Sequence, residues 1–206
     1  MHRIGVLASG KGSNLQALLD DEVVGPGVAL VVSDRADAGA LERARGRGVA
    51  AVVLDPGEHP SREAYDEGLL ELLRSEGIDV VLLAGFMRIL SPGLVRAHWG
   101  RMLNVHPALL PAFPGAHAVA DALACGVKVS GATVHFVDEE IDHGPIVLQE
   151  AVPVLEGDDE ASLHARIREA EHRIYPRAVR LLLDGRLSIE GRRVVVRGRT
   201  DREELA

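Results

Sequence analysis

The sequence predicts an α/β protein with a mostly parallel, Rossmann-like sheet, helices on both faces and an antiparallel part towards the carboxyl end. Short apolar runs rich in Val, Ile and Leu alternate with segments of helical periodicity over the first half of the chain. This alternation is typical of strand–helix–strand units. The apolar runs are nearly continuous, as expected for strands that are covered on both faces.

The predicted elements of the first half follow in chain order. Strands are predicted at residues 3–8, 29–33, 50–54, 79–84 and 102–105. Helices are predicted between them at residues 14–20, 40–47, 62–75 and 92–98. In such sheets ligands bind at the carboxyl ends of the strands, so a site is expected in the loops that follow them.

The pattern changes after His106, where prolines and Gly115 interrupt a stretch that suits neither a helix nor the interior of a strand. A helix is then predicted at 116–125, strands at 129–137 and 146–152, and a hairpin around Gly191 at 187–196. Between these lies a long helix at 159–183, because apolar residues recur there every three or four positions. No repeat or linker interrupts the chain, so one domain is expected.

Composition and charge exclude several classes of function. Of the 206 residues 47% are apolar and 26% are charged, the balance of an ordinary soluble globular protein. The net charge of −8 and the aromatic content of 3% argue against a nucleic-acid footprint. An apolar strand begins almost at once, so neither a signal peptide nor a membrane span is expected. Cys125 is the only cysteine, which fits a reducing cytoplasm.

A glycine-rich turn, Ser9-Gly10-Lys11-Gly12-Ser13-Asn14, follows the first predicted strand and opens the first predicted helix. Free N–H groups at a helix start favour an anion. The turn departs from the Walker pattern, because Gly12 stands where a Ser or Thr must hold magnesium. It departs from the dinucleotide fingerprint, because Leu15 replaces the third glycine. By itself the turn leaves phosphate binding and a plain strand-to-helix connection equally open.

A second group of polar residues suggests chemistry. Asn104 and His106 lie two residues apart at the end of a predicted strand, so their side chains project to the same face. Asp142 lies in an acidic loop, and a carboxylate folded over His106 would favour the imidazolium and raise the pKa of His106. From position alone a structural histidine and a solvated acidic turn remain open.

Four segments together resemble one enzyme family. They are Ser9-Gly10-x-Gly12-Ser13-Asn14-Leu15-Gln16-Ala17, Ala84-Gly85-Phe86-Met87-Arg88-Ile89-Leu90-Ser91-Pro92, Asn104-x-His106-Pro107-Ala108-Leu109-Leu110-Pro111 and Asp142-x-Gly144-Pro145. With these motifs the chain resembles the folate-dependent phosphoribosylglycinamide formyltransferases from about residue 3 to about residue 185. The glycine turn alone is unspecific, whereas the third segment with the later Asp is specific to 10-formyltetrahydrofolate enzymes.

The resemblance implies a formyltransferase fold in one domain, residues 1–206, in which 1–100 bind phosphate and 101–206 carry the folate and catalytic groups. It implies a cytoplasmic enzyme of purine (IMP) biosynthesis that moves the formyl group of 10-formyltetrahydrofolate to the amine of glycinamide ribonucleotide. The folate is a co-substrate and no metal is required. The expected partners are these two small molecules, with no nucleic acid or membrane, and the chain is expected to be a monomer or a homodimer.

The resemblance also implies roles for residues. Asn104 and His106 would donate hydrogen bonds to the formyl oxygen, and Asp142 would keep His106 cationic and assist proton transfer. The residues implied for glycinamide ribonucleotide are Gly10, Lys11, Gly12, Ser13, Asn14 and Glu171. Those implied for folate are Arg62, Met87, Arg88, Ile89, Leu90, Asn104, Asp138, Glu139, Glu140, Ile141 and Asp142. Without the resemblance, Glu171 is better interpreted as an exposed helix carboxylate.

Four other functions share parts of this pattern. A formyltetrahydrofolate hydrolase uses a similar Asn, His and Asp with water as acceptor, but normally carries an extra domain before the first strand. A methionyl-tRNA formyltransferase continues into a basic carboxyl-terminal domain. A non-catalytic nucleotide-binding module would need the glycine turn without the Asn, His and Asp. The incomplete dinucleotide fingerprint weighs against a hydride-transfer enzyme.

Overall fold

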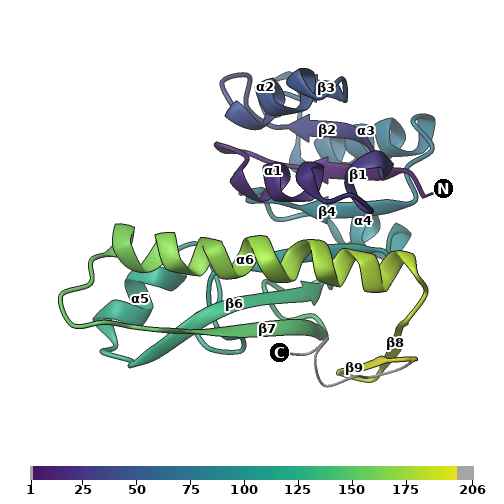
Figure 1. The fold of residues 1–206 in the computed structure, drawn as a ribbon. Helices are drawn as coiled ribbons and strands as arrows, with labels where there is room; N and C mark the ends of the chain where they lie inside the picture. The colour runs from purple at the N-terminus through teal and green to yellow at the C-terminus, as the bar shows by residue number, and fades with distance from the viewer. Residues whose placement is uncertain (1, 199–206) are drawn as a thin grey trace.

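The structure, a computed structural model, describes residues 2–198, and one sheet of nine strands organises them (Figure 1). The strand order is β3-β2-β1-β4-β5-β6-β7-β9-β8. The first five strands pair in parallel: β1 (Ile4–Leu7), β2 (Val28–Ser33), β3 (Ala50–Val53), β4 (Val80–Leu83) and β5 (Met102–His106). The sheet then continues antiparallel through β6 (Val129–Phe136) and β7 (Ile146–Pro153).

The predicted hairpin forms the far edge of this sheet. Strands β8 (Leu187–Glu190) and β9 (Arg193–Val196) pair antiparallel, and β9 joins β7 where Ile146 is in register with Arg193. Gly191 between them has a φ of 62°, a conformation that a residue without Cβ adopts without strain.

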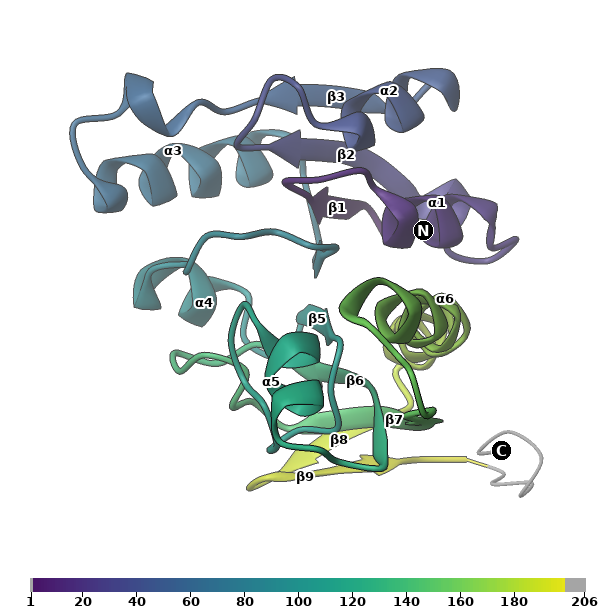
Figure 2. The same ribbon diagram turned by 90° about the vertical axis from the view of Figure 1, so that its left-hand side faces the viewer.

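Helices cover both faces, as Figure 2 shows in a view turned by 90°. Helices α1 (Ser13–Asp20), α2 (Gly39–Gly46), α5 (Ala118–Ala124) and α6 (Glu160–Leu183) contribute to one apolar cluster, and α3 (Arg62–Ser75) and α4 (Pro92–Ala97) to the other. Adjacent residues of β1 show the division, since Val6 belongs to the first cluster and Leu7 to the second. The predicted fold class is confirmed.

Every predicted strand and helix is present, with ends that differ by at most two residues. Local capping explains where the helices begin. The hydroxyl of Ser61 accepts from the amide of Ala64 at α3, and Asp159 forms a capping box with Ser162 at α6. Two short 3₁₀ turns, η1 (Gly25–Gly27) and η2 (Pro56–Glu58), were not predicted.

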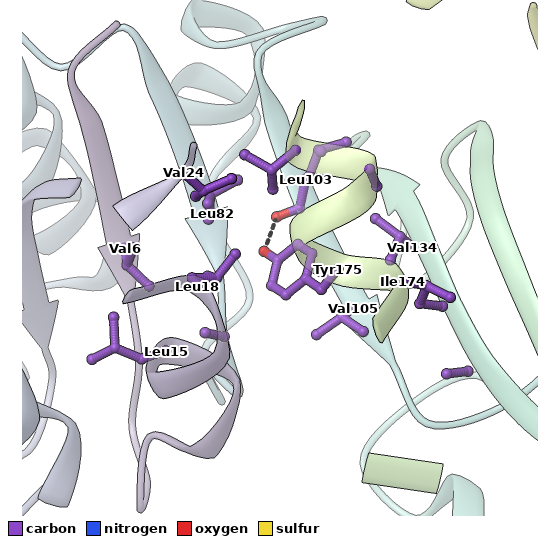
Figure 3. Close-up of a cluster of buried hydrophobic side chains, with 14 of the residues drawn as sticks. Val6, Leu15, Leu18, Val24, Leu82, Leu103, Val105, Val134, Ile174 and Tyr175 are labelled. Atoms are coloured by element: carbon purple, nitrogen blue, oxygen red, sulfur yellow. Dashed lines mark hydrogen bonds between the residues drawn. The ribbon is translucent and has the colours of Figure 1, made fainter. Parts of the chain in front are cut away.

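Helix α6 joins the parallel and the antiparallel parts of the sheet, because it packs against α1 as well as β6 and β7. Its Tyr175 is fully buried, and the phenolic oxygen lies 2.9 Å from the carbonyl oxygen of Leu83 and 3.1 Å from that of Leu103. Figure 3 shows the contact with Leu103 inside the apolar cluster. The single hydroxyl hydrogen thus links α6 to two neighbouring strands, β4 and β5.

No helix among residues 2–198 combines the length and apolarity needed to cross a bilayer.

Replacing Tyr175 by Phe removes this link and leaves a buried carbonyl without its donor, so Tyr175→Phe should lower the free energy of unfolding by about 1–2 kcal/mol. Urea unfolding measures the change. Tyr65→Phe is the matched control, because the equally buried hydroxyl of Tyr65 has no hydrogen-bond partner in the structure. Equal losses in the two variants would contradict the role given to Tyr175.

Candidate active site

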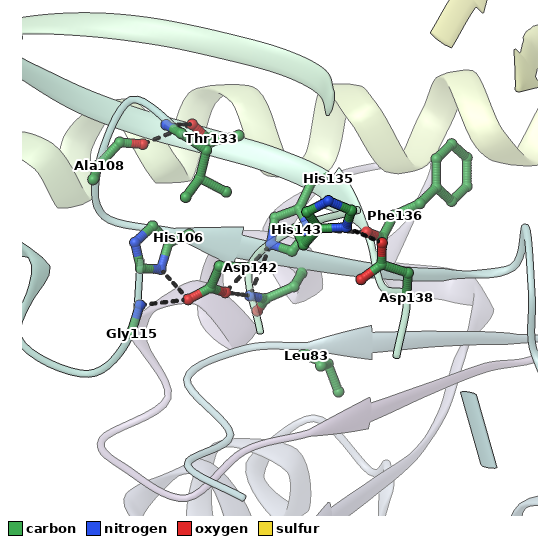
Figure 4. A network of polar contacts seen from close by, with 12 residues as sticks. Leu83, His106, Ala108, Gly115, Thr133, His135, Phe136, Asp138, Asp142 and His143 are labelled. Carbon is green, nitrogen blue, oxygen red and sulfur yellow. Dashed lines mark hydrogen bonds and ion pairs between the residues drawn. The ribbon is translucent and has the colours of Figure 1, made fainter. Parts of the chain in front are cut away.

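Asn104, His106 and Asp142 converge at the carboxyl end of β5. Figure 4 shows His106 facing Asp142. Asn104 and His106 lie two residues apart on the strand, so their side chains project from the same face. Asp142 lies in the loop between β6 and β7. His106 Nδ1 is 3.3 Å from one carboxylate oxygen of Asp142, and Asn104 Nδ2 is 3.3 Å from the other. The structure therefore brings together the three residues implied to be catalytic.

The backbone around Asp142 is held in an unusual shape. Asp142 itself has a φ of 51°, in the left-handed region that non-glycine residues seldom adopt. A Cβ at Gly144 would lie 1.8 Å from the carbonyl oxygen of Phe136, so only glycine fits there. The amide of Gly115 donates to the Asp142 carboxylate at 2.8 Å. Contacts on both sides thus direct the carboxylate at His106.

Both ring nitrogens of His106 face oxygen atoms of the protein. Nε2 lies 2.8 Å from the carbonyl oxygen of Phe113, and Nδ1 faces Asp142. Only the imidazolium can donate to both. Burial nevertheless lowers the pKa of His106 below its ordinary value, although Asp142 and the Phe113 carbonyl act in the opposite direction. Asp142 thus raises the pKa of His106, as expected, but in the free chain the cost of burying the charge outweighs the attraction of the carboxylate.

The pKa of Asp142 is lowered despite its burial. Desolvation would raise the pKa of this carboxyl, but hydrogen bonding with His135, the charge of His106 and the Gly115 amide together favour the ionised form. The carboxylate is accordingly suited to remain charged next to the imidazole.

His135 on β6 is a member of this cluster that the sequence did not identify. Its Nδ1 donates to the carbonyl oxygen of Phe136 at 2.8 Å, and its Nε2 lies 3.2 Å from Asn104 Nδ2. The same Nε2 is 3.6 Å from Asp142. These contacts orient the Asn104 amide, since the opposite orientation would set its oxygen against the carboxylate. His135 is opposite Asn104 in the β5–β6 register, which sequence periodicity does not reveal.

The glycine turn has the backbone shape of an anion site. Gly12 precedes α1 with a φ of 75°, and a Cβ there would lie 2.7 Å from the Cα of Ala40. The amide of Ala40 donates to the carbonyl of Gly10 at 3.1 Å, which holds the turn against α2. No side chain caps α1, so its first amides are available to an anion. Lys11 is exposed beside them.

Asn14 and Glu171 form a buried pair next to this turn. Asn14 Nδ2 donates to the Glu171 carboxylate at 2.9 Å, and Glu171 is only 3% exposed. The interpretation of Glu171 as an exposed helix carboxylate is therefore wrong, because α6 points it into the junction with α1. Burial raises the pKa of Glu171 to about 7. Asn14 Oδ1 is also buried and has no hydrogen-bond partner in the structure, which is unusual for a buried amide oxygen.

The first segment implied for folate is fastened at several points. Arg62 Nη2 donates to the carbonyl oxygen of Leu90 at 2.9 Å, so in this structure Arg62 holds the segment. The guanidinium of Arg88 stacks 4.6 Å above the ring of Tyr65. Met87 and Ile89 remain more than half exposed, whereas Leu90 is buried. Two apolar side chains are therefore presented to solvent on a fixed backbone.

The second segment, the loop at 138–142, faces α4. Glu139 accepts from Arg96 at 2.8 Å, and Asp138 pairs with His143 at 2.7 Å. The side chain of Ile141 is exposed. A cavity of about 530 Å³ opens between this loop and α4, with a lining of Val95, Arg96, Trp99, Asp138, Glu139 and Glu140. This volume suits a small organic ligand.

Among residues 2–198 no group of three or more His, Cys, Asp or Glu side chains is arranged to hold a metal ion.

The model of the family described as formyl transferase matches residues 2–179. This chain belongs to the formyl transferase family. It is 48% identical to the phosphoribosylglycinamide formyltransferase of Escherichia coli K12 over 190 residues, which cover 90% of this chain and 89% of that protein. The crystal structure of glycinamide ribonucleotide transformylase 1 from Symbiobacterium toebii superposes with a TM-score of 0.94 at 56% identity, covering 96% and 95% of the two chains.

Longer relatives also contain this formyl transferase unit. The trifunctional purine biosynthetic protein adenosine-3 of Drosophila pseudoobscura is 49% identical over 190 residues, 90% of this chain. The chain spans only 14% of that protein's length. Formyl transferases use formyltetrahydrofolate as co-substrate, so the family membership implies a folate donor here.

Titration of Glu171 should make stability fall as pH rises. Between its ordinary pKa of 4.5 and about 7, the native chain keeps a proton that the unfolded chain releases. The free energy of unfolding should therefore decrease across this window, by on the order of 3 kcal/mol. Glu171→Gln stays neutral and should remove this contribution, which urea unfolding at pH 5, 6, 7 and 8 measures.

Glu169→Gln, which removes an exposed carboxylate from the same helix, is the control. If the Glu171→Gln variant keeps the pH dependence of the unmodified chain, the buried carboxyl is not its source.

Proposed function

We propose that this chain transfers the formyl group of 10-formyltetrahydrofolate to the amine of 5-phosphoribosylglycinamide, giving formylglycinamide ribonucleotide and tetrahydrofolate in purine biosynthesis. The observation that carries the proposal is the convergence of Asn104, His106 and Asp142 beside an anion-suited glycine turn. We also propose a cytoplasmic location, because a chain with a single cysteine needs no oxidising compartment for disulfide formation.

The reaction needs charge stabilisation on one oxygen and transfer of one proton. The substrate amine attacks the formyl carbon, a C–N bond forms, and negative charge develops on the formyl oxygen. Asn104 and cationic His106 donate hydrogen bonds to this oxygen, a contribution of about 2.7–4 kcal/mol for each preorganised donor. Asp142 accepts the proton of the attacking amine and returns it to N10 of the folate as the old C–N bond breaks.

The geometry of His106 adds a requirement to this scheme. Nδ1 faces Asp142, so Nε2 is the nitrogen that donates to the formyl oxygen, and the Phe113 carbonyl occupies that direction in the free chain. The substrate oxygen must therefore share or replace this carbonyl as the acceptor. A substrate that brings negative charge close to Nε2 also opposes the effect of burial and favours the imidazolium.

The acceptor substrate has complementary groups on the chain. Its phosphate is expected on the backbone of Gly10, Lys11, Gly12 and Ser13, where free amides and the α1 dipole favour an anion. Its ribose hydroxyls are expected at Asn14 and Glu171, where the unpartnered Asn14 oxygen accepts. A phosphate next to hydroxyl groups is what a ribonucleotide presents.

The donor is expected between the two segments that present apolar side chains. Met87, Ile89 and Ile141 are exposed on backbone that is fixed elsewhere, and flat apolar surface suits a pteridine ring. Main-chain groups of Arg88, Leu90 and the 138–142 loop, which includes Glu140, would bind the polar edge of the ring. The guanidinium of Arg62 holds the Leu90 carbonyl, so Arg62 supports the donor indirectly by fixing this segment. If the guanidinium gives up that contact, it can bind a carboxylate of the folate tail directly.

The decisive assay mixes the purified chain with 10-formyltetrahydrofolate, with and without glycinamide ribonucleotide, and follows folate release. We expect release to depend on the acceptor and to match formylglycinamide ribonucleotide formed. Equal release in both mixtures would identify a hydrolase instead, since water would then be the acceptor. No release in either mixture would refute formyl transfer.

Asp142→Asn should reduce kcat by about 100-fold or more, because the amide cannot accept the proton that moves between the two nitrogens. Steady-state kinetics over a range of pH measures the effect. Asp184→Asn, at the exposed end of α6, is the control for loss of one carboxylate. A variant at Asp142 with unchanged rate and pH profile would remove this residue from the mechanism.

A further inference from the structure

The loop at 107–115 supplies two backbone groups to the catalytic cluster. The carbonyl oxygen of Phe113 is 2.8 Å from His106 Nε2, and the amide of Gly115 is 2.8 Å from the Asp142 carboxylate. A backbone group keeps such a contact only if its loop is held in place. His106 and Asp142 do not fasten the base of this loop, so other residues must do so.

Two side chains of the sheet bind the base of the loop. Thr133 Oγ1 donates to the carbonyl of Ala108 at 2.6 Å and accepts from the amide of Leu110 at 3.1 Å. Gln149 Nε2 donates to the carbonyl of Leu110 at 2.9 Å and to Thr133 Oγ1 at 3.0 Å. The hydroxyl of Thr133, which is fully buried, therefore uses its one hydrogen and both lone pairs. Figure 4 shows its contact with Ala108 beside the His106–Asp142 pair.

The sheet register explains why these side chains meet the loop. Thr133 is in register with His106 across β5 and β6, and with Gln149 across β6 and β7. The three side chains thus form one row across three strands, on the face that carries the catalytic imidazole. Gly131 permits the close approach of the loop, since a Cβ there would lie 2.7 Å from a methyl carbon of Leu109.

We propose that Thr133 and Gln149 are positioning residues of the active site, which hold residues 108–110 so that Phe113 and Gly115 stay in contact with His106 and Asp142. Their catalytic consequence rests on the proposed formyl transfer, whereas their effect on His106 does not. Loss of the Thr133 hydroxyl leaves the buried Ala108 carbonyl and Leu110 amide without this partner. The loop then relaxes, and its two contacts with the cluster lengthen.

Thr133→Val tests the proposal, because valine has nearly the shape of threonine without the hydroxyl. We expect kcat to fall by about 10-fold to 100-fold, the scale of a small misplacement of catalytic groups. KM for both substrates should change by no more than about twofold, because the substrate contacts are kept. Thr133→Ser restores the hydroxyl and should recover most of the rate. Gln149→Leu should act in the same direction, and the double variant should lose less than the sum of the two.

The titration of His106, followed by NMR on the imidazole, separates positioning from mere stability. The Phe113 carbonyl favours the imidazolium, so the pKa of His106 should fall in Thr133→Val and return in Thr133→Ser. Ser130→Ala is the matched control, since Ser130 lies on the same strand and its buried hydroxyl has no partner. Each variant is compared at a temperature where circular dichroism and urea unfolding show it folded.

A folded Thr133→Val variant with the kcat and the His106 titration of the unmodified chain would overturn the proposal. So would equal losses in Ser130→Ala and Thr133→Val. Failure of the unmodified chain to transfer formyl would refute the proposed function alone, because the NMR titration tests the positioning role without turnover.

Discussion

The Asp142 carboxylate is the group on which the candidate site depends. It meets the imidazole of His106, the amide of Asn104, the imidazole of His135 and the backbone N–H of Gly115. Its side chain is only 11% exposed, so these four contacts replace the water that a buried charge loses. Because one anion satisfies every one of these groups, its position also decides theirs. The β6–β7 loop that carries Asp142 is accordingly held by close backbone contacts.

Helix α6 has a comparable role between the two parts of the sheet. Its Tyr175 contacts Leu83 of β4 and Leu103 of β5, and one turn earlier its Glu171 contacts Asn14 at the start of α1. The anion-suited turn comes from the beginning of the chain and the catalytic cluster from its middle, so a rigid element must set their separation. A buried hydroxyl and a buried carboxyl on one helix provide this connection.

Opposing effects act on the charge of the His106 imidazole in the free chain. Burial disfavours the cation, whereas Asp142 and the Phe113 carbonyl favour it, and the first effect prevails in the absence of substrate. Negative charge that develops on a substrate oxygen also favours the imidazolium, as the oxygens of Asp142 and Phe113 do. A site of this kind stabilises the imidazolium most when the transition state is present, which is the condition for catalysis. The Phe113 oxygen belongs to the loop that Thr133 and Gln149 hold, so its position next to His106 depends on these two contacts.

The sequence by itself determined the fold class, every strand and helix to within two residues, and the motif residues Asn104, His106 and Asp142. Local forces decide these features: periodic apolar residues, capping side chains, and glycines and prolines at turns. Only the tertiary structure showed that His135 contacts Asn104, that Thr133 holds the loop after His106, that Glu171 is buried against Asn14, and that the pKa of His106 is lowered. These properties depend on strand register and on the exclusion of water from buried groups. They also depend on contacts such as that between Asn14 and Glu171, which are 157 positions apart in the sequence. No local pattern encodes them, because they exist only once distant segments are packed together.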